Sequence, residues 1–225
     1  MIPNWPLAEV LRDFIEFTNA QKGAYSDACA GFGNNAVSVG QQVALASRPT
    51  GMRVDREGVP TVMRTAVEDP TQPNVIVHTI RLATEFLEAN GPEGRNEQQV
   101  CRAIVVFVFA YWDEETRPRC ARLLSVPVQS LEMPVAGDLR RLRHAILHNK
   151  GVLGVNEHGK LEVLADLFRP GTELRFNHAT MTEMFKQIDK GFAVFVGRVL
   201  DLPEPPGGWA NIAQITIPQP PPGAR

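Results

Sequence analysis

The ten-residue apolar run AIVVFVFAYW, residues 103–112, limits what this chain can fold into more than any other stretch. A helix needs about 20 apolar residues to cross a bilayer, so this run is too short to span one. It lies within a longer helical pattern that starts near Asn96 and ends near Glu115. We therefore predict a buried core helix and no transmembrane segment.

Composition favours a cytoplasmic protein with one good core. The chain has 225 residues, 44% of them apolar, and a formal charge of −2. This charge gives no general attraction to nucleic acid or to anionic membranes, so contact with either requires a local basic patch. The first twenty residues have the pattern of an amphipathic helix rather than of a signal peptide.

The three cysteines give no sign of a disulfide framework or of a zinc site. Cys29, Cys101 and Cys120 are widely spaced, their number is odd, and no CxxC occurs. This usage is typical of a reducing compartment. Cys120 lies among three arginines, which favours a reactive thiolate. A packed, unreactive thiol is the simpler alternative.

Apolar residues recur at helical spacing along most of the first half of the chain. One helix covers PLAEVLRDFIEFTNAQ, and a weaker helical stretch follows over 25–47, with a glycine-containing junction at GFGNNA. That motif lacks the glycine spacing of a phosphate-binding loop. Residues 48–74 are rich in Pro, Gly and charge and predict a loop with at most a short helical turn, whereas 75–89 again show a helical pattern.

The pattern changes in the last third of the chain. VLGV and LEVLADLF predict short strands joined by a hairpin at NEHGK, and PGTELRFN predicts one more extended piece. A strong helix follows over 179–200, with a capping box from Thr180 to Glu183. Residues 201–225 are rich in Pro and Gly and predict a flexible tail. Docking of the part around Trp209 as an extended strand is the alternative.

The stretch RLRHAILHNKG, residues 141–151, carries more basic and titratable groups than a packing helix needs. On a helical wheel with ~100° per residue, one side is apolar and faces the core: Leu139, Leu142, Ala145 and Ile146. The other side is basic: Arg140, Arg141, His144 and His148. Arg143 lies on the border beside Leu147, whose apolar side chain is out of phase with the core. This predicts a second helix packed there, as in a dimer interface. Asp138 stands close to the predicted start of the helix, where its charge suits the positive helix end.

Arg143 and His148 are the candidate catalytic residues. They are five positions apart and point ~140° away from each other, so one chain does not bring them together. Two copies of the helix that cross near Leu147 would place both pairs in one cleft. Such a cleft suits phosphodiester cleavage without a metal, because imidazole transfers protons near neutral pH and guanidinium stabilises the charge of the transition state.

Three alternatives stay open for the same residues. Basic side chains near the end of a helix that terminates at Gly151 also complement the helix dipole without any chemical role. His144 and His148 have the i, i+4 spacing of metal ligands, although the sequence positions no third ligand and the nearby arginines disfavour a cation. The basic face is also suited to docking a protein or a nucleic acid without catalysis.

The pattern resembles the HEPN family of prokaryotic defence and toxin proteins. The family signature is Arg, a polar residue, about three variable positions and His, and RHAILH at 143–148 matches it together with its flanks in DLRRLRHAILHNKG. FAYWDEETRPRCARLL resembles the aromatic and acidic helix that these proteins carry upstream. The resemblance covers about 75–200. His144 departs from the Asn or Asp that is usual at the polar position.

The resemblance implies a helical domain that dimerises and cleaves RNA, without a metal or another cofactor, at a site shared by two protomers. Arg143 would stabilise the transition state, and His148 would act as acid and base. The supporting residues would be His144, Asn149 and Glu114. The RNA-binding residues would be Arg140, Arg141 and Lys150.

We accordingly predict a mostly α fold, a HEPN-like helical bundle with a short β-hairpin or extended insert before the last helix. Residues 1–74 would pack on or extend the bundle, 75–200 would form the HEPN-like domain, and 201–225 would form the tail. The predicted function is a homodimeric, metal-independent endoribonuclease of a prokaryotic defence or toxin–antitoxin system. RNA is its substrate, an antitoxin or another defence protein its further partner, and no membrane is involved. The alternative is a non-catalytic HEPN-like module that binds RNA or a partner protein through its basic helix.

Overall fold

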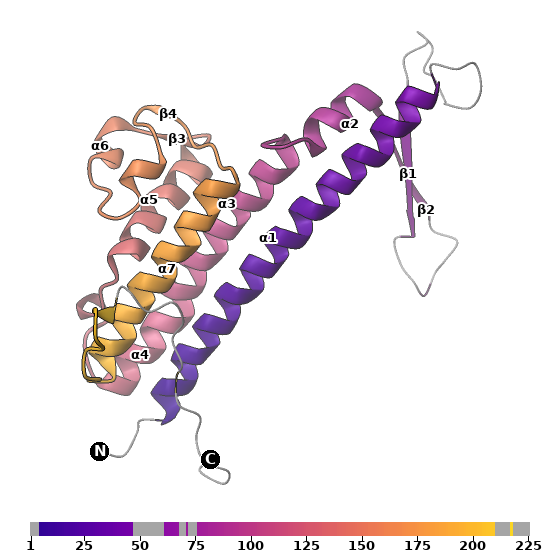
Figure 1. Cartoon of the computed structure of the whole chain (residues 1–225). Helices are drawn as coiled ribbons and strands as arrows, with labels where there is room; N and C mark the ends of the chain where they lie inside the picture. The colour runs from indigo at the N-terminus through magenta and orange to yellow at the C-terminus, as the bar shows by residue number, and fades with distance from the viewer. Residues whose placement is uncertain (1–4, 47–60, 68–70, 72–75, 210–216, 218–225) are drawn as a thin grey trace. The chain divides into compact units, whose positions relative to one another are not determined.

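The computed structural model describes residues 5–46, 61–67, 71, 76–209 and 217 (Figure 1). Its elements, in chain order, are α1 (Trp5–Ala46), β1 (Thr61–Val67), β2 (Ile76–Leu82), α2 (Ala83–Asn90), α3 (Arg95–Ala110), η1 (Tyr111–Thr116), α4 (Arg117–Leu124), η2 (Val128–Ser130), α5 (Pro134–His148), β3 (Val152–Leu153), α6 (Val155–His158), η3 (Ala165–Leu167), β4 (Thr172–Glu173) and α7 (His178–Val199). The prediction of a mostly α fold is confirmed. No helix in the described part of the chain has the length and apolar character needed to span a membrane.

The chain divides into two compact units, which are described separately. One contains residues 1–25 and 100–225, and the other contains residues 26–99. The border predicted between residues 74 and 75 does not separate these units. The reason is that β1 and β2, which lie on either side of that border, pair with each other.

Aromatic side chains form the centre of the first unit. The ring centroid of Phe14 in α1 lies 4.5 Å from that of Phe192 in α7 and 5.7 Å from that of Trp112 in η1. Trp112 meets Phe195 of α7 edge to face at 4.8 Å. All four side chains are buried, and burial of each large apolar side chain stabilises the fold by about 1.5–3 kcal/mol. The predicted core helix at 96–115 is thus confirmed, as α3 followed by the π-helical turn η1.

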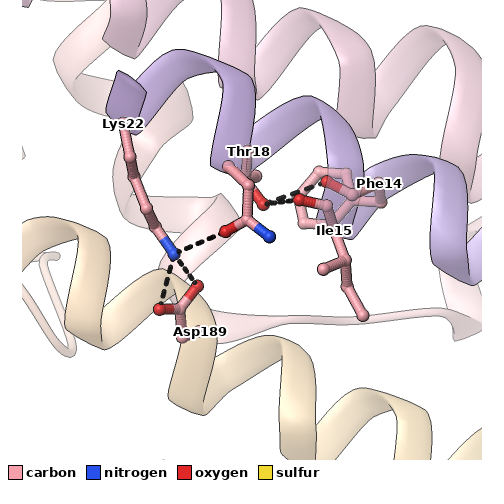
Figure 2. Close-up of polar contacts among 6 residues, drawn as sticks. Phe14, Ile15, Thr18, Lys22 and Asp189 are labelled. Atoms are coloured by element: carbon pink, nitrogen blue, oxygen red, sulfur yellow. Dashed lines mark hydrogen bonds and ion pairs between the residues drawn. The ribbon is translucent and has the colours of Figure 1, made fainter. Parts of the chain in front are cut away.

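A polar clamp joins α1 to α7 at the edge of this core (Figure 2). The Nζ atom of Lys22 lies 2.8 and 2.7 Å from the two carboxylate oxygens of Asp189 and 3.2 Å from Oδ1 of Asn19. One turn earlier on α1, the Thr18 hydroxyl donates to the backbone carbonyl oxygens of Phe14 and Ile15, so this buried side chain has its hydrogen bonds within the helix. The clamp fixes the register of two helices that are far apart in sequence.

Replacement of Asp189 by Asn is expected to lower the free energy of unfolding by roughly 0.5–1 kcal/mol. The effect is small because the Lys22 and Asp189 side chains are 30% and 44% exposed, so water screens the pair. Urea denaturation of the wild type and of the variant measures the difference, and 1 M NaCl should reduce it. Glu9→Gln, which removes an exposed acid elsewhere on α1, is the matched control. Equal unfolding of wild type and Asp189→Asn would show that the pair contributes nothing.

Two predictions for the second unit are wrong. Residues 61–67 form a strand rather than a loop, and 76–82 form a strand rather than the start of a helix; the two pair antiparallel, with Thr61 opposite Leu82. Branched residues explain the outcome, because TVMRTAV and IVHTIRL are rich in Val, Ile and Thr, which favour strands once a partner strand is present. Only Ala83–Asn90 keeps the predicted helix. Its residues Ala83 and Phe86 pack with Val39 in a small core.

The predicted junction at GFGNNA is also wrong, because α1 is one continuous helix of 42 residues. A glycine inside a helix costs about 1 kcal/mol relative to alanine, but it keeps its backbone N–H. No proline, which would remove that donor, occurs between Leu7 and Ala46. The glycines therefore weaken the helix without ending it.

The insert before α7 differs from the predicted hairpin. Val152–Leu153 pair with Thr172–Glu173, not with LEVLADLF, and the NEHGK region contains the short helix α6 in place of a turn. The predicted extended piece in PGTELRFN is confirmed as β4. The ring Nε2 of His158 lies 3.1 and 2.9 Å from the carbonyl oxygens of Ala165 and Phe168 and ties α6 to η3.

Both ends of α7 are defined by contacts that the sequence analysis assigned differently. The predicted final helix is confirmed, but its N-cap is Asn177, whose Oδ1 accepts from the backbone N–H of Thr180, so the predicted capping box is wrong. In the tail, the Trp209 ring occupies the space beside Gly197, where a Cβ would overlap it, and Ile217 is buried. At these two positions the predicted flexible tail is packed, although no strand forms over 201–209; residues 210–216 and 218–225 lie outside the described part.

Candidate functional site

Helix α5 presents its faces as the helical wheel predicts. Leu139, Leu142 and Ala145 are buried, Ile146 is half-buried, and Arg140 is exposed. The helix starts at Pro134, one turn earlier than predicted, because proline suits a first helical position. Asp138 is consequently in the second turn and does not serve the helix end. Its buried carboxylate instead accepts hydrogen bonds from backbone N–H groups in the insert.

Arg143 is held against an aromatic ring and has no anionic partner in the part of the chain that the structure describes. Its Cζ atom lies 5.8 Å from the centre of the Phe109 ring on α3. Its Nε is buried without a hydrogen bond, and no ion pair among the described residues includes its guanidinium. Cation–π contact stabilises such a group by about 0.5–2 kcal/mol without neutralising its charge. Arg143 therefore presents a positive charge that an incoming anion can neutralise.

His144 and His148 lie side by side on the exposed face of α5. Their ring centroids are 4.9 Å apart at an interplanar angle of 40°. Neither ring makes a hydrogen bond or ion pair within the described residues, so the ring nitrogens are available for hydrogen bonds to a ligand. No group of three or more potential metal ligands occurs in the part of the chain that the structure describes. The structure thus pairs the two histidines and leaves Arg143 on the flank that faces α3.

The turn after α5 is secured from α3 by a residue that the sequence analysis missed. The Gly151 N–H donates to the carbonyl oxygen of Ala145 at 2.8 Å, and Lys150 and Gly151 both have positive φ, at 54° and 80°. A Cβ on Gly151 would lie 3.3 Å from the guanidinium carbon of Arg102. Arg102 also pairs with Glu173 at 2.7 Å. The segment that follows His148 is therefore fixed between α3 and β4.

The remaining predicted residues are only partly brought together. Arg141 forms an ion pair with Glu157 at 2.9 Å, so its charge is shared within the protein. Hydrogen bonds from Lys160 and Arg141 lower the pKa of the Glu157 carboxyl. Asn149, the C-cap of α5, is exposed, as are Arg140 and Lys150.

Glu114 makes no contact with the candidate site among the described residues. It is exposed on η1 and makes no hydrogen bond or ion pair with α5 among the described residues. Its neighbour Asp113 pairs with Arg117 at 3.2 Å. No observed contact therefore supports the role predicted for Glu114.

Cys120 is a packed, unreactive thiol rather than a reactive thiolate. Its side chain is fully buried, and this burial raises the pKa of the thiol to about 12, against the smaller lowering effect of Arg119. A thiol with this pKa is protonated at neutral pH and is a poor nucleophile.

Comparison with known proteins identifies no relative of this chain. Neither the family models, nor the curated proteins, nor the solved structures contain a match to the chain.

Proposed function

We propose that this chain is a metal-independent endoribonuclease of a prokaryotic defence or toxin–antitoxin system. One observation carries the proposal. The half-buried guanidinium of Arg143 rests on Phe109 without an anionic partner among the described residues, and the same helix carries a pair of exposed imidazoles, His144 and His148, on another face. A fixed cation can stabilise transition-state charge, and imidazoles can transfer protons, which are the two functions needed to cleave a phosphodiester without a metal. The match of RHAILH to the HEPN signature supports the same function.

In the proposed reaction, a neutral imidazole of His148 accepts the proton of the ribose 2′-hydroxyl, whose oxygen attacks the adjacent phosphorus. The bond from phosphorus to the 5′-oxygen breaks, and a protonated imidazole donates a proton to that oxygen. The guanidinium of Arg143 stabilises the additional negative charge on the phosphoryl oxygens. The products are a 2′,3′-cyclic phosphate and a 5′-hydroxyl.

The site is proposed to be shared by two protomers. Arg143 and His148 point ~140° apart on α5, which places them on different flanks of one helix. Two large apolar side chains on the same pair of helices are exposed, Phe107 on α3 at 55% and Leu147 on α5 at 49%. Burial of these side chains against a second copy would favour association and would supply the missing half of the cleft.

The experiment that tests the function is RNA cleavage by the purified full chain in EDTA. The expected products end in a 2′,3′-cyclic phosphate, and expression in cells is expected to arrest growth unless His148 is replaced by Ala. RNA that stays intact at concentrations where the dimer is populated would contradict the proposal. A stable complex with RNA or a partner protein, formed without cleavage, would instead favour the non-catalytic module.

Leu147→Glu is expected to convert the dimer to monomer and to reduce cleavage by at least about tenfold, because a buried charge at an apolar contact costs several kcal/mol. Sedimentation velocity measures the association, and cleavage is assayed on the same samples. Val155→Glu is the matched control, since Val155 is also an exposed branched apolar residue, at 66%, but lies on α6. A wild type that cleaves RNA as a strict monomer would rule out the shared site.

A further inference from the structure

A hollow of about 300 Å³ opens between η1 and the first half of α5. Its lining includes Phe109, the same ring on which the Arg143 guanidinium lies. Sites for small molecules begin at about this volume, so the hollow has room for a planar ring system such as a nucleobase. It therefore adjoins the proposed cleavage site and is large enough to hold a nucleobase.

The two walls of the hollow carry opposite hydrogen-bonding groups. Asp113 comes from η1, and Arg140 comes from α5. Arg117 holds the first wall in place, because its Nε donates to the carbonyl oxygens of Val128 and Leu131 at 3.1 and 2.9 Å and its Nη1 donates to Asp113. The second carboxylate oxygen of Asp113 has no partner among the described residues and can accept further hydrogen bonds.

The charge of the hollow disfavours phosphate. Its lining contains the carboxylates of Asp113, Glu132 and Glu162 and the guanidinium groups of Arg117 and Arg140. The adjoining flank of α5 has the opposite character, because Arg143 lies there without an anionic partner among the described residues. A phosphate is thus attracted to the α5 flank, whereas the hollow suits a neutral group that offers several hydrogen-bond donors.

The positions of Arg140 and Arg143 on α5 connect the hollow to the proposed cleavage site. Arg140 and Arg143 are three residues apart, so they are neighbours on the helix surface, with about 5–6 Å between their Cβ atoms. An RNA strand whose scissile phosphate lies at Arg143 therefore has a flanking base within reach of Arg140 and of the hollow.

We propose that the hollow binds a guanine base next to the scissile phosphate and thereby sets the cleavage specificity; this inference rests on the proposed ribonuclease function. Guanine offers two adjacent donors, N1–H and the 2-amino group, which match the carboxylate of Asp113. It also offers two adjacent acceptors, O6 and N7, which match the guanidinium of Arg140. Adenine, cytosine and uracil lack this pair of adjacent donors. The edge of guanine that carries N1–H and the 2-amino group is accessible, because single-stranded RNA leaves it unpaired.

The test uses single-stranded oligouridine substrates that contain one G, A, C or inosine at a fixed position. The wild type is expected to cleave beside G about tenfold faster, as kcat/KM, than beside A or C, since each well-placed pair of hydrogen bonds discriminates by about that factor or more. Inosine, which lacks the 2-amino group, should lose part of the preference. Asp113→Asn should reduce the preference for G, whereas Glu115→Gln, an exposed neutralisation on the same η1 turn outside the hollow, should keep it.

Cleavage without any preference for G would overturn the inference and leave the proposed function standing. Absence of all cleavage by folded protein would overturn the function, and the hollow is then tested by NMR titration with the four nucleoside monophosphates. Chemical shift changes at Trp112 and Gly137, both in the lining, should be largest with guanosine monophosphate. Equal changes with all four would reject the hollow as a guanine site. Because Asp113→Asn also alters the contact to Arg117, Arg140→Gln provides a second variant that leaves that wall intact.

Discussion

Arg143→Ala is expected to slow RNA cleavage by about 100- to 1,000-fold, the usual effect of removing one group that stabilises transition-state charge. The same change should lower the free energy of unfolding by only about 0.5–1 kcal/mol, the value of a cation–π contact that is partly exposed. The stability effect is small because no hydrogen bond or ion pair of Arg143 is broken in the described structure. Single-turnover cleavage rates and urea denaturation, measured on the same preparation, separate the two effects.

Arg122→Ala is the matched control for Arg143→Ala. It removes the same charge from an exposed position in the last turn of α4, outside α5 and outside the hollow. Its cleavage rate should stay within about threefold of the wild type, the scale of a distant surface charge. A comparable loss in both variants would mean that general charge, rather than the position of Arg143, promotes binding of RNA.

A mixture of two inactive variants tests whether the site is shared. Arg143→Ala and His148→Ala protomers, refolded together, form mixed dimers in which one chain retains Arg143 and the other retains His148. Activity should return in part, because a shared cleft then contains one group of each kind. If each chain had its own complete site, no chain in the mixture would carry both groups and the activity would stay absent.

The periodic features of the fold were predictable from sequence. The stripe of Leu139 and Leu142 and the helix that ends at Val199 follow from apolar spacing, which reports the local backbone directly. The pairing of β1 with β2 was not predictable in the same way, because each strand needs a partner that lies several residues away and on its own has a helix-like or loop-like pattern. Local sequence decides an element only where the element does not depend on a distant one.

The candidate site likewise has a part that local sequence predicts and a part that depends on distant residues. Arg143 and His148 were identified from their spacing, since both lie on one helix. Phe109, on which Arg143 rests, and Arg102, which packs against Gly151, come from α3 and are brought to α5 only by the tertiary fold. A basic residue near an aromatic run was visible in the sequence, but nothing in the spacing specified which ring would meet which guanidinium.

Asp138 is the clearest case of a residue whose role needed the structure. Its spacing suggested a helix end, yet its carboxylate, 1% exposed, accepts from the backbone N–H groups of Glu162, Val163 and Leu164 at 3.0, 2.7 and 2.8 Å. These donors are 24 to 26 residues away. Hydrogen bonds to a charged acceptor contribute about 1.5–3 kcal/mol each, and buried donors that lose their acceptor are costly. Asp138 thus holds the insert against α5.

Asp138→Ala is expected to lower the free energy of unfolding by about 3–5 kcal/mol, because several backbone donors lose their only acceptor at once. Asp138→Asn should cost less, since one oxygen of the same shape remains to accept. Asp166→Ala, an exposed acid within the same insert, should change stability by less than about 0.5 kcal/mol. Urea denaturation measures all three, and limited proteolysis shows whether cleavage within 151–177 increases first. If Asp138→Ala unfolds like the wild type, the insert is held by its apolar contacts, Leu153, Leu164 and Phe176 among them, and the carboxylate is dispensable.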